Sequence, residues 1–143
     1  MQCRTLIVDD EPLARMRMRS MLEPYASEFE VVGEAGSGEE AVQKIREESP
    51  DVVFLNIQMP DMTAFDVLQK INEDEMPLIV FTTAYENFAL RAFEENTVDY
   101  LLKPIEEERL ANTVEKLRKR LVSLDSDSQI PLDFSWDQFR SMI

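Results

Sequence analysis

The sequence predicts a doubly wound α/β domain built on a five-stranded parallel sheet. Short apolar segments alternate along the chain with longer amphipathic segments, in five repeats. The apolar segments are mostly continuous runs, which is typical of parallel strands that are covered on both faces. Because crossovers between parallel strands are right-handed, the repeated strand–helix unit predicts helices on both faces of one sheet.

The expected elements follow one another in a regular order. Strands are expected at residues 5–8, 29–34, 51–55, 78–82 and 98–102. Helices are expected at residues 12–23, 37–48, 65–72, 86–95 and 106–121. Pro12 lies in the first turn of the first helix, where its missing N–H costs little. Ser37 or Gly38 is expected at the cap of the second helix, whose inner face carries Ala41, Val42 and Ile45.

Residues 123–143 differ from the rest of the chain. They open with the polar stretch SLDSDSQ, which predicts a linker. Beyond it, Trp136, Phe139 and Ile143 share one face of a potential short helix. We therefore expect one domain over residues 1–122 and a tail over 123–143 without a complete output domain. The tail is either a frayed end, the stub of a removed domain, or a docking segment.

Composition limits the classes of function. The chain has 143 residues and a net charge of −14, from 29 acidic and 15 basic residues. The one basic cluster, residues 116–120, is best explained as a helix end that complements its dipole, so this chain alone is not expected to bind DNA. With one cysteine, Cys3, and no histidine, an intramolecular disulfide and a Cys/His metal cluster are excluded.

Targeting signals are not expected either. The apolar runs are far shorter than the roughly 18 residues of a membrane helix. The chain opens almost directly into a strand, without a basic and apolar leader. A cytoplasmic location and no membrane contact are the expectation.

Polar residues follow four of the predicted strands. The first strand ends in Asp9 and Asp10, the third in Asn56, the fourth in Thr83, and Lys103 follows the fifth. In doubly wound folds, ligands bind outside the carboxyl ends of the strands. A pair of carboxylates suits Mg²⁺, and a hydroxyl with an ammonium group suits a phosphoryl group. The combination predicts a phosphate-handling site.

These motifs carry a family resemblance. Over residues 3–122 the chain resembles the flavodoxin-like receiver domain of two-component response regulators, through LIVDDEP, DVVFLNIQMPDM, FTTAY and DYLLKP. The spacings also match: 47 residues from Asp9 to Asn56, 27 to Thr83 and 20 to Lys103. FTTAYENFALRAFEENTVDYLLKPI is especially similar to receivers of the LytR/AlgR (LytTR) class of transcription regulators, which normally continue into a DNA-binding domain.

The resemblance assigns roles to individual residues. It implies that Asp9, Asp10, residue 56 and the backbone carbonyl of Gln58 hold Mg²⁺. It implies that Thr83 is the switch hydroxyl and Lys103 the phosphate-contacting lysine. Pro104 matches the proline often joined by a cis peptide, and Tyr100 matches the aromatic that reports the switch.

Asn56 departs from the family pattern, because it falls on the phosphoacceptor aspartate. An amide cannot form a stable acyl phosphate, so phosphotransfer at this position should fail and Mg²⁺ binding should weaken. The amide is an engineered lock on an ordinary receiver, a feature of a natural receiver that works without phosphate, or a structural residue beneath a misleading similarity. Thr63 and Ala64 also replace an Asp-Gly-like pair, which predicts a different loop before the third helix.

Two functions follow from this interpretation. The first is the receiver domain of a LytTR-type regulator, whose parent protein is phosphorylated by a sensor histidine kinase. The second is a stand-alone, phosphorylation-independent adaptor that binds a protein partner. An enzyme acting on other substrates is not expected. The resemblance implies a switch face, suited to a homodimer, over the fourth helix, fifth strand and fifth helix; there the chain offers Phe88, Arg91, Phe93, Tyr100 and Lys116.

Overall fold

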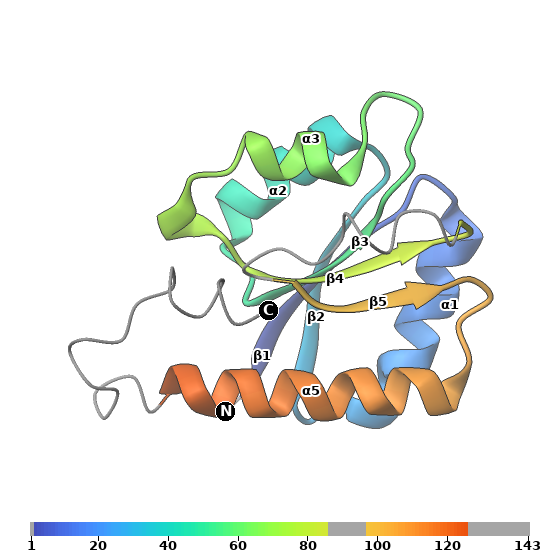
Figure 1. The fold of residues 1–143 in the computed structure, drawn as a ribbon, viewed down its shortest axis with the longest axis vertical. Helices are drawn as coiled ribbons and strands as arrows, with labels where there is room; N and C mark the ends of the chain where they lie inside the picture. The colour runs from blue at the N-terminus through green and yellow to red at the C-terminus, as the bar shows by residue number, and fades with distance from the viewer. Residues whose placement is uncertain (1, 86–96, 126–143) are drawn as a thin grey trace.

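The computed structural model describes residues 2–85 and 97–125. Five parallel strands form one sheet in the order β2-β1-β3-β4-β5 (Figure 1). The strands are β1 (Cys3–Val8), β2 (Phe29–Ala35), β3 (Val52–Asn56), β4 (Leu78–Thr83) and β5 (Thr97–Leu102). The predicted doubly wound parallel sheet is confirmed.

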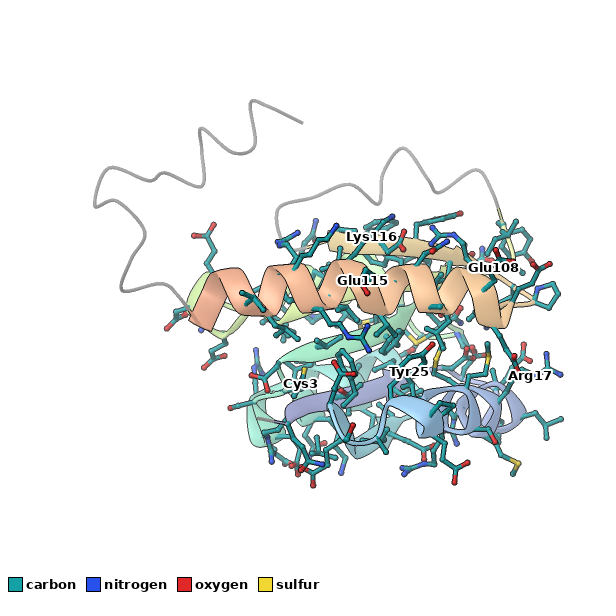
Figure 2. The ribbon with its side chains drawn as sticks, turned by 90° about the horizontal axis from the view of Figure 1, so that it is seen from below. Cys3, Arg17, Tyr25, Glu108, Glu115 and Lys116 are labelled. Atoms are coloured by element: carbon teal, nitrogen blue, oxygen red, sulfur yellow. The ribbon has the colours of Figure 1, made fainter. Side chains whose placement is uncertain are left out.

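Helices cover both faces of this sheet. They are α1 (Pro12–Leu22), α2 (Gly38–Glu48), α3 (Ala64–Gln69) and α5 (Glu107–Asp125), with 3₁₀ turns at Glu23–Tyr25 and Glu73–Glu75. Figure 1 shows α2 and α3 on one face and α1 with α5 on the other. Figure 2 shows the second face, where α5 carries Glu108, Glu115 and Lys116 across the molecule. The helix expected at 86–95, with Phe88, Arg91 and Phe93, lies outside the described residues, as does the end of the tail.

The apolar core lies in two layers, one on each side of the sheet. On the α2 and α3 side, Ala41, Val42 and Ile45 are buried, as their helical spacing predicts. On the other side, α5 buries Leu110, Val114 and Leu117 against the strands. The central strand β3 is buried along its whole length, so it delivers its last residue, Asn56, to the top of a rigid sheet. Among the described residues, no helix is both long and apolar enough to cross a lipid bilayer.

Two helix boundaries differ from the prediction. Helix α5 continues to Asp125, into the stretch predicted to be a linker. No glycine or proline interrupts residues 107–125, so the backbone has no reason to leave the helix at residue 121. Helix α3 begins at Ala64 and ends at Gln69, earlier than predicted.

The start of α3 explains how Thr63 and Ala64 are accommodated. The hydroxyl of Thr63 accepts a hydrogen bond from the Asp66 amide, and the Asp66 carboxylate accepts one from the Thr63 amide. This capping box satisfies two amides at the helix start. Ala64 is the first helical residue and is fully buried, so the loop needs no glycine there.

The loop between β3 and α3 is also tied to the start of α2. The Asp61 carboxylate accepts hydrogen bonds from the amides of Gly38 (2.9 Å) and Glu39 (3.0 Å). These bonds, from Gly38 first and then Glu39, hold the pKa of Asp61 below its usual value. Ser37 caps the same helix, as predicted, by accepting from the Glu40 amide.

Candidate functional site

Strand register brings the predicted site residues to one edge of the sheet. Asn56 at the end of β3 pairs with Thr82 of β4, and Thr83 pairs with Leu102 at the end of β5. The amide of Lys103 donates to the Thr83 carbonyl at 2.7 Å, which fixes the loop after β5 beside β4. The carboxyl ends of these strands therefore lie together, as expected for a ligand site in a doubly wound sheet.

Asp9 is a buried carboxylate with a cation beside it. Only 4% of the residue is exposed, and its Oδ2 lies 2.6 Å from Nζ of Lys103. Its other oxygen accepts a hydrogen bond from the Glu11 amide at 3.0 Å. Burial of a charge is expensive unless it is paired, and Lys103 supplies the charge that neutralises Asp9.

Asn56 is buried between two oxygen atoms of the site. Its Nδ2 donates to Oδ1 of Asp10 at 3.1 Å and to the carbonyl of Gln58 at 2.8 Å. An ionised carboxylate and a backbone carbonyl can only accept hydrogen bonds. The amide must therefore turn its nitrogen, and not its oxygen, toward both of them.

The residues assigned to switching, Thr83 and Tyr100, lie on the neighbouring strands β4 and β5. Thr83 is buried, and its hydroxyl accepts a hydrogen bond from the Tyr85 amide at 3.1 Å. Tyr100 is half-buried, and its hydroxyl donates to the Tyr85 carbonyl. The bond between Lys103 and Pro104 is cis, as the resemblance implies. Thr83 and Tyr100 thus both contact Tyr85, in the loop that follows β4.

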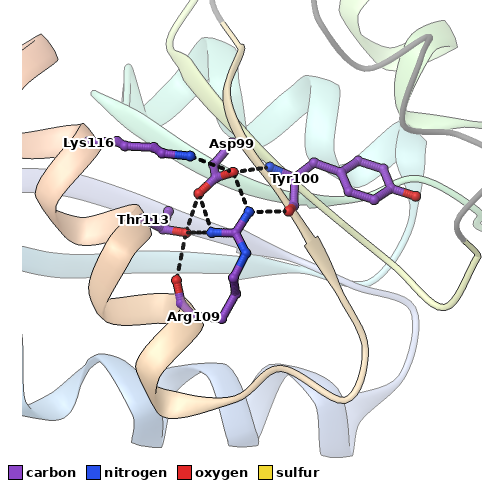
Figure 3. A network of polar contacts seen from close by, with 5 residues as sticks. All are labelled: Asp99, Tyr100, Arg109, Thr113 and Lys116. Carbon is purple, nitrogen blue, oxygen red and sulfur yellow. Dashed lines mark hydrogen bonds and ion pairs between the residues drawn. The ribbon is translucent and has the colours of Figure 1, made fainter.

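A second polar cluster, which the sequence analysis missed, lies on the other side of β5 (Figure 3). Both carboxylate oxygens of Asp99 pair with Arg109 at 2.7 Å, and one also accepts from the Thr113 hydroxyl at 2.7 Å. Lys116 approaches Asp99 at 3.3 Å. We call these four residues the Asp99 cluster. Two features of the sequence indicate this cluster: an aspartate inside the apolar run VDYLL, and polar residues at helical spacing at 109, 113 and 116.

The Asp99 cluster holds its carboxylate ionised. Burial by itself raises the pKa of Asp99, but hydrogen bonds from Arg109, Thr113 and the Tyr100 amide outweigh burial and lower it to about 2. Arg109 also donates to the Tyr100 carbonyl at 3.0 Å. The cluster therefore fastens α5 to the strand that carries Tyr100.

The arrangement fits a divalent cation only in part. Asp9, Asp10 and the Gln58 carbonyl supply the hard oxygen ligands that Mg²⁺ prefers. Asn56, however, directs N–H groups toward Asp10 and Gln58, and an N–H group cannot bind a cation. Within residues 2–85 and 97–125, no three Asp, Glu, Cys or His side chains come together as a metal-binding group. As it lies, Asn56 does not fit the role of third side-chain ligand.

The fold and the strand-end site together define a signalling domain of the two-component type. A family model described as the response regulator receiver domain matches residues 5–115, and the chain belongs to this family. Receiver domains generally bind Mg²⁺ at their acidic phosphorylation site and typically interact with histidine kinases.

Its relatives include transcriptional regulatory proteins and response regulatory proteins. The chain is 44% identical over 135 residues to the transcriptional regulatory protein BtsR of Salmonella typhi, covering 92% of this chain and 56% of that protein. It is 44% identical over 115 residues to an uncharacterized response regulatory protein of Vibrio cholerae, covering 80% of this chain and 48% of the relative. The chain thus spans about half the length of these relatives.

Solved structures of receiver domains have the same fold. The receiver domain of AraT, a response regulator from Geobacillus stearothermophilus, is 32% identical, with a TM-score of 0.76 over 87% of this chain and 99% of that one. The response regulatory domain of mrkE from Klebsiella pneumoniae is 31% identical, with a TM-score of 0.70 over 82% of this chain and 96% of that one.

Proposed function

We propose that this chain is the receiver domain of a LytTR-type transcription regulator that cannot accept phosphate at residue 56. The observation that carries the proposal is the position of Asn56. Its amide ends the buried strand β3 beside Asp10, where the resemblance expects the phosphoacceptor carboxylate. Thr83 and Lys103 lie at the same edge of the sheet.

The chemistry of an amide explains why phosphotransfer fails. A phosphoacceptor must attack with a carboxylate oxygen and leave an acyl phosphate. The Asn56 amide carries no full negative charge, and its nitrogen is already engaged with Asp10 and Gln58. The domain therefore keeps the conformation of an unphosphorylated receiver, and Mg²⁺ binds it more weakly than it binds a receiver with aspartate at this position.

Partners follow from the class of protein. A sensor histidine kinase is the proposed partner of the parent protein. A homodimer through β5, α5 and the segment between β4 and β5 is proposed for the same parent. With a net charge of −14, the chain is not proposed to bind DNA by itself.

The test is chemical phosphorylation of a restored carboxylate. With acetyl phosphate and Mg²⁺, we expect Asn56→Asp to gain one phosphoryl group that hydroxylamine removes, and the unsubstituted chain to gain none at residue 56. Intact-protein and peptide mass spectrometry measure both. Asn112→Asp is the matched control, because it adds the same charge on the exposed surface of α5. An inert Asn56→Asp would contradict the receiver proposal and favour a phosphorylation-independent adaptor.

A further inference from the structure

We infer that the Asn56 amide group takes the place of the divalent cation, so that the folded domain does not depend on bound metal for its stability. The inference rests on the proposed function, since it concerns the site where receivers hold Mg²⁺. It adds a property that the absence of a nucleophile does not imply: the stability of this chain is independent of Mg²⁺, and one side-chain atom is the reason.

The two hydrogen bonds of Asn56 show how the replacement works. A cation in this site would draw together the Asp10 carboxylate and the Gln58 carbonyl, which otherwise present two electron-rich oxygens to each other. Nδ2 of Asn56 lies 3.1 Å from the first oxygen and 2.8 Å from the second. Its two hydrogens carry partial positive charge, and one is available for each oxygen.

Lys103 completes the neutralisation of the acidic pair. Its ammonium group lies 2.6 Å from the buried carboxylate of Asp9. Asp9 is thus paired with a full positive charge and Asp10 with an amide donor. Every fully buried side-chain nitrogen and oxygen of the described residues has a hydrogen-bond partner, so no buried polar atom of the site requires a bound ion to satisfy it.

An aspartate at residue 56 would reverse this balance. Its carboxylate has no N–H to give, so a third negative group would face the Asp10 carboxylate and the Gln58 carbonyl. Like charges at such short distances repel each other strongly when they are shielded from water. Asn56→Asp should therefore be stabilised by an external cation, whereas in the unsubstituted chain the Asn56 amide already occupies that place.

Thermal unfolding in EDTA and in about 10 mM Mg²⁺ tests the inference. The metal concentration is chosen to saturate the site of a receiver domain. We expect the midpoint of the unsubstituted chain to be the same in both conditions, within about 1 °C. We expect Asn56→Asp to unfold about 4–8 °C lower than the unsubstituted chain in EDTA and to recover in Mg²⁺. Asn112→Asp, which adds the same charge away from the site, should follow the unsubstituted chain in both conditions.

A second readout observes the amide group itself. In ¹⁵N spectra of the unsubstituted chain, the side-chain NH₂ signals of Asn56 should be slow to exchange with solvent and unmoved by Mg²⁺. Direct titration should show about 100-fold weaker Mg²⁺ affinity than for Asn56→Asp, or no binding. A shift of the Asn56 NH₂ signals at sub-millimolar Mg²⁺, or an equal gain in stability from Mg²⁺ in both proteins, would overturn the inference.

These outcomes are separate from those of the proposed function. Failure of Asn56→Asp to accept phosphate while its stability depends on Mg²⁺ would contradict the receiver proposal and support the cation replacement. Phosphorylation of Asn56→Asp with no difference in the response of stability to Mg²⁺ would support the receiver and overturn the replacement.

Discussion

Replacing Asp99 with alanine is expected to lower the free energy of unfolding by about 3 kcal/mol. Asp99 is 3% exposed and accepts hydrogen bonds from Arg109, Thr113 and the Tyr100 amide. Removing one partner of a buried ion pair leaves the other without its counter-charge. The loss lies at the lower end of the usual range because the Arg109 side chain is 40% exposed and can be rehydrated. Urea unfolding of the two proteins measures the difference.

The same variant has a predictable dependence on pH. The folded-state pKa of Asp99 is about 2, below its ordinary value of 3.8, so the stability it contributes is present above pH 4 and lost as the pH falls toward 2. The deficit of Asp99→Ala should therefore shrink between pH 4 and pH 2. Asp74→Ala, at an exposed position, is the control for charge removal. A deficit under 1 kcal/mol (roughly the value of an exposed ion pair) at neutral pH would show that the Asp99 cluster does not hold α5.

Replacing Lys103 with methionine is expected to cost about 3–4 kcal/mol. The Asp9 side chain is only 6% exposed, and Lys103 at 2.6 Å is the cation that neutralises it. Methionine keeps much of the apolar stem but removes the ammonium, so a buried carboxylate remains with the Glu11 amide as its described donor. Urea unfolding in EDTA isolates this loss from any contribution of metal.

Lys119→Met serves as the matched control for Lys103→Met. Lys119 is exposed on α5, and its replacement removes the same charge without reaching the site. We expect its effect to stay within about 0.5 kcal/mol. Equal effects of the two substitutions would mean that Lys103 does not neutralise Asp9 in solution.

Much of the fold could be predicted from sequence because its signals are local. Apolar runs and helical spacing predict the described strands and helices to within a few residues, and parallel strands bring their carboxyl ends together without knowledge of any side chain. Asp9, Asn56, Thr83 and Lys103 could therefore be placed at one edge of the sheet. That Lys103 pairs with Asp9 and not with Asp10 is a finding of the structure.

Other features depend on contacts that sequence spacing does not reveal. The Asp10 carboxylate and the Gln58 carbonyl, which the turn after β3 brings alongside, together orient the Asn56 amide. The Asp99 cluster joins a strand to a helix and becomes evident only when α5 is docked. The capping bond of Thr63 depends on the loop geometry, so the expectation of a differently shaped loop did not include it.

The most direct test of the central claim is an amide NMR titration with beryllofluoride and Mg²⁺. Beryllofluoride mimics an acyl phosphate only when a carboxylate can hold it, so Asn56→Asp should respond and the unsubstituted chain should not. In the variant, the account predicts shifts at Thr83, Tyr100 and Lys103, the residues assigned to the switch. If neither protein showed amide shifts, or if both showed equal shifts, the claim that Asn56 alone separates this domain from a working phosphoacceptor would be contradicted.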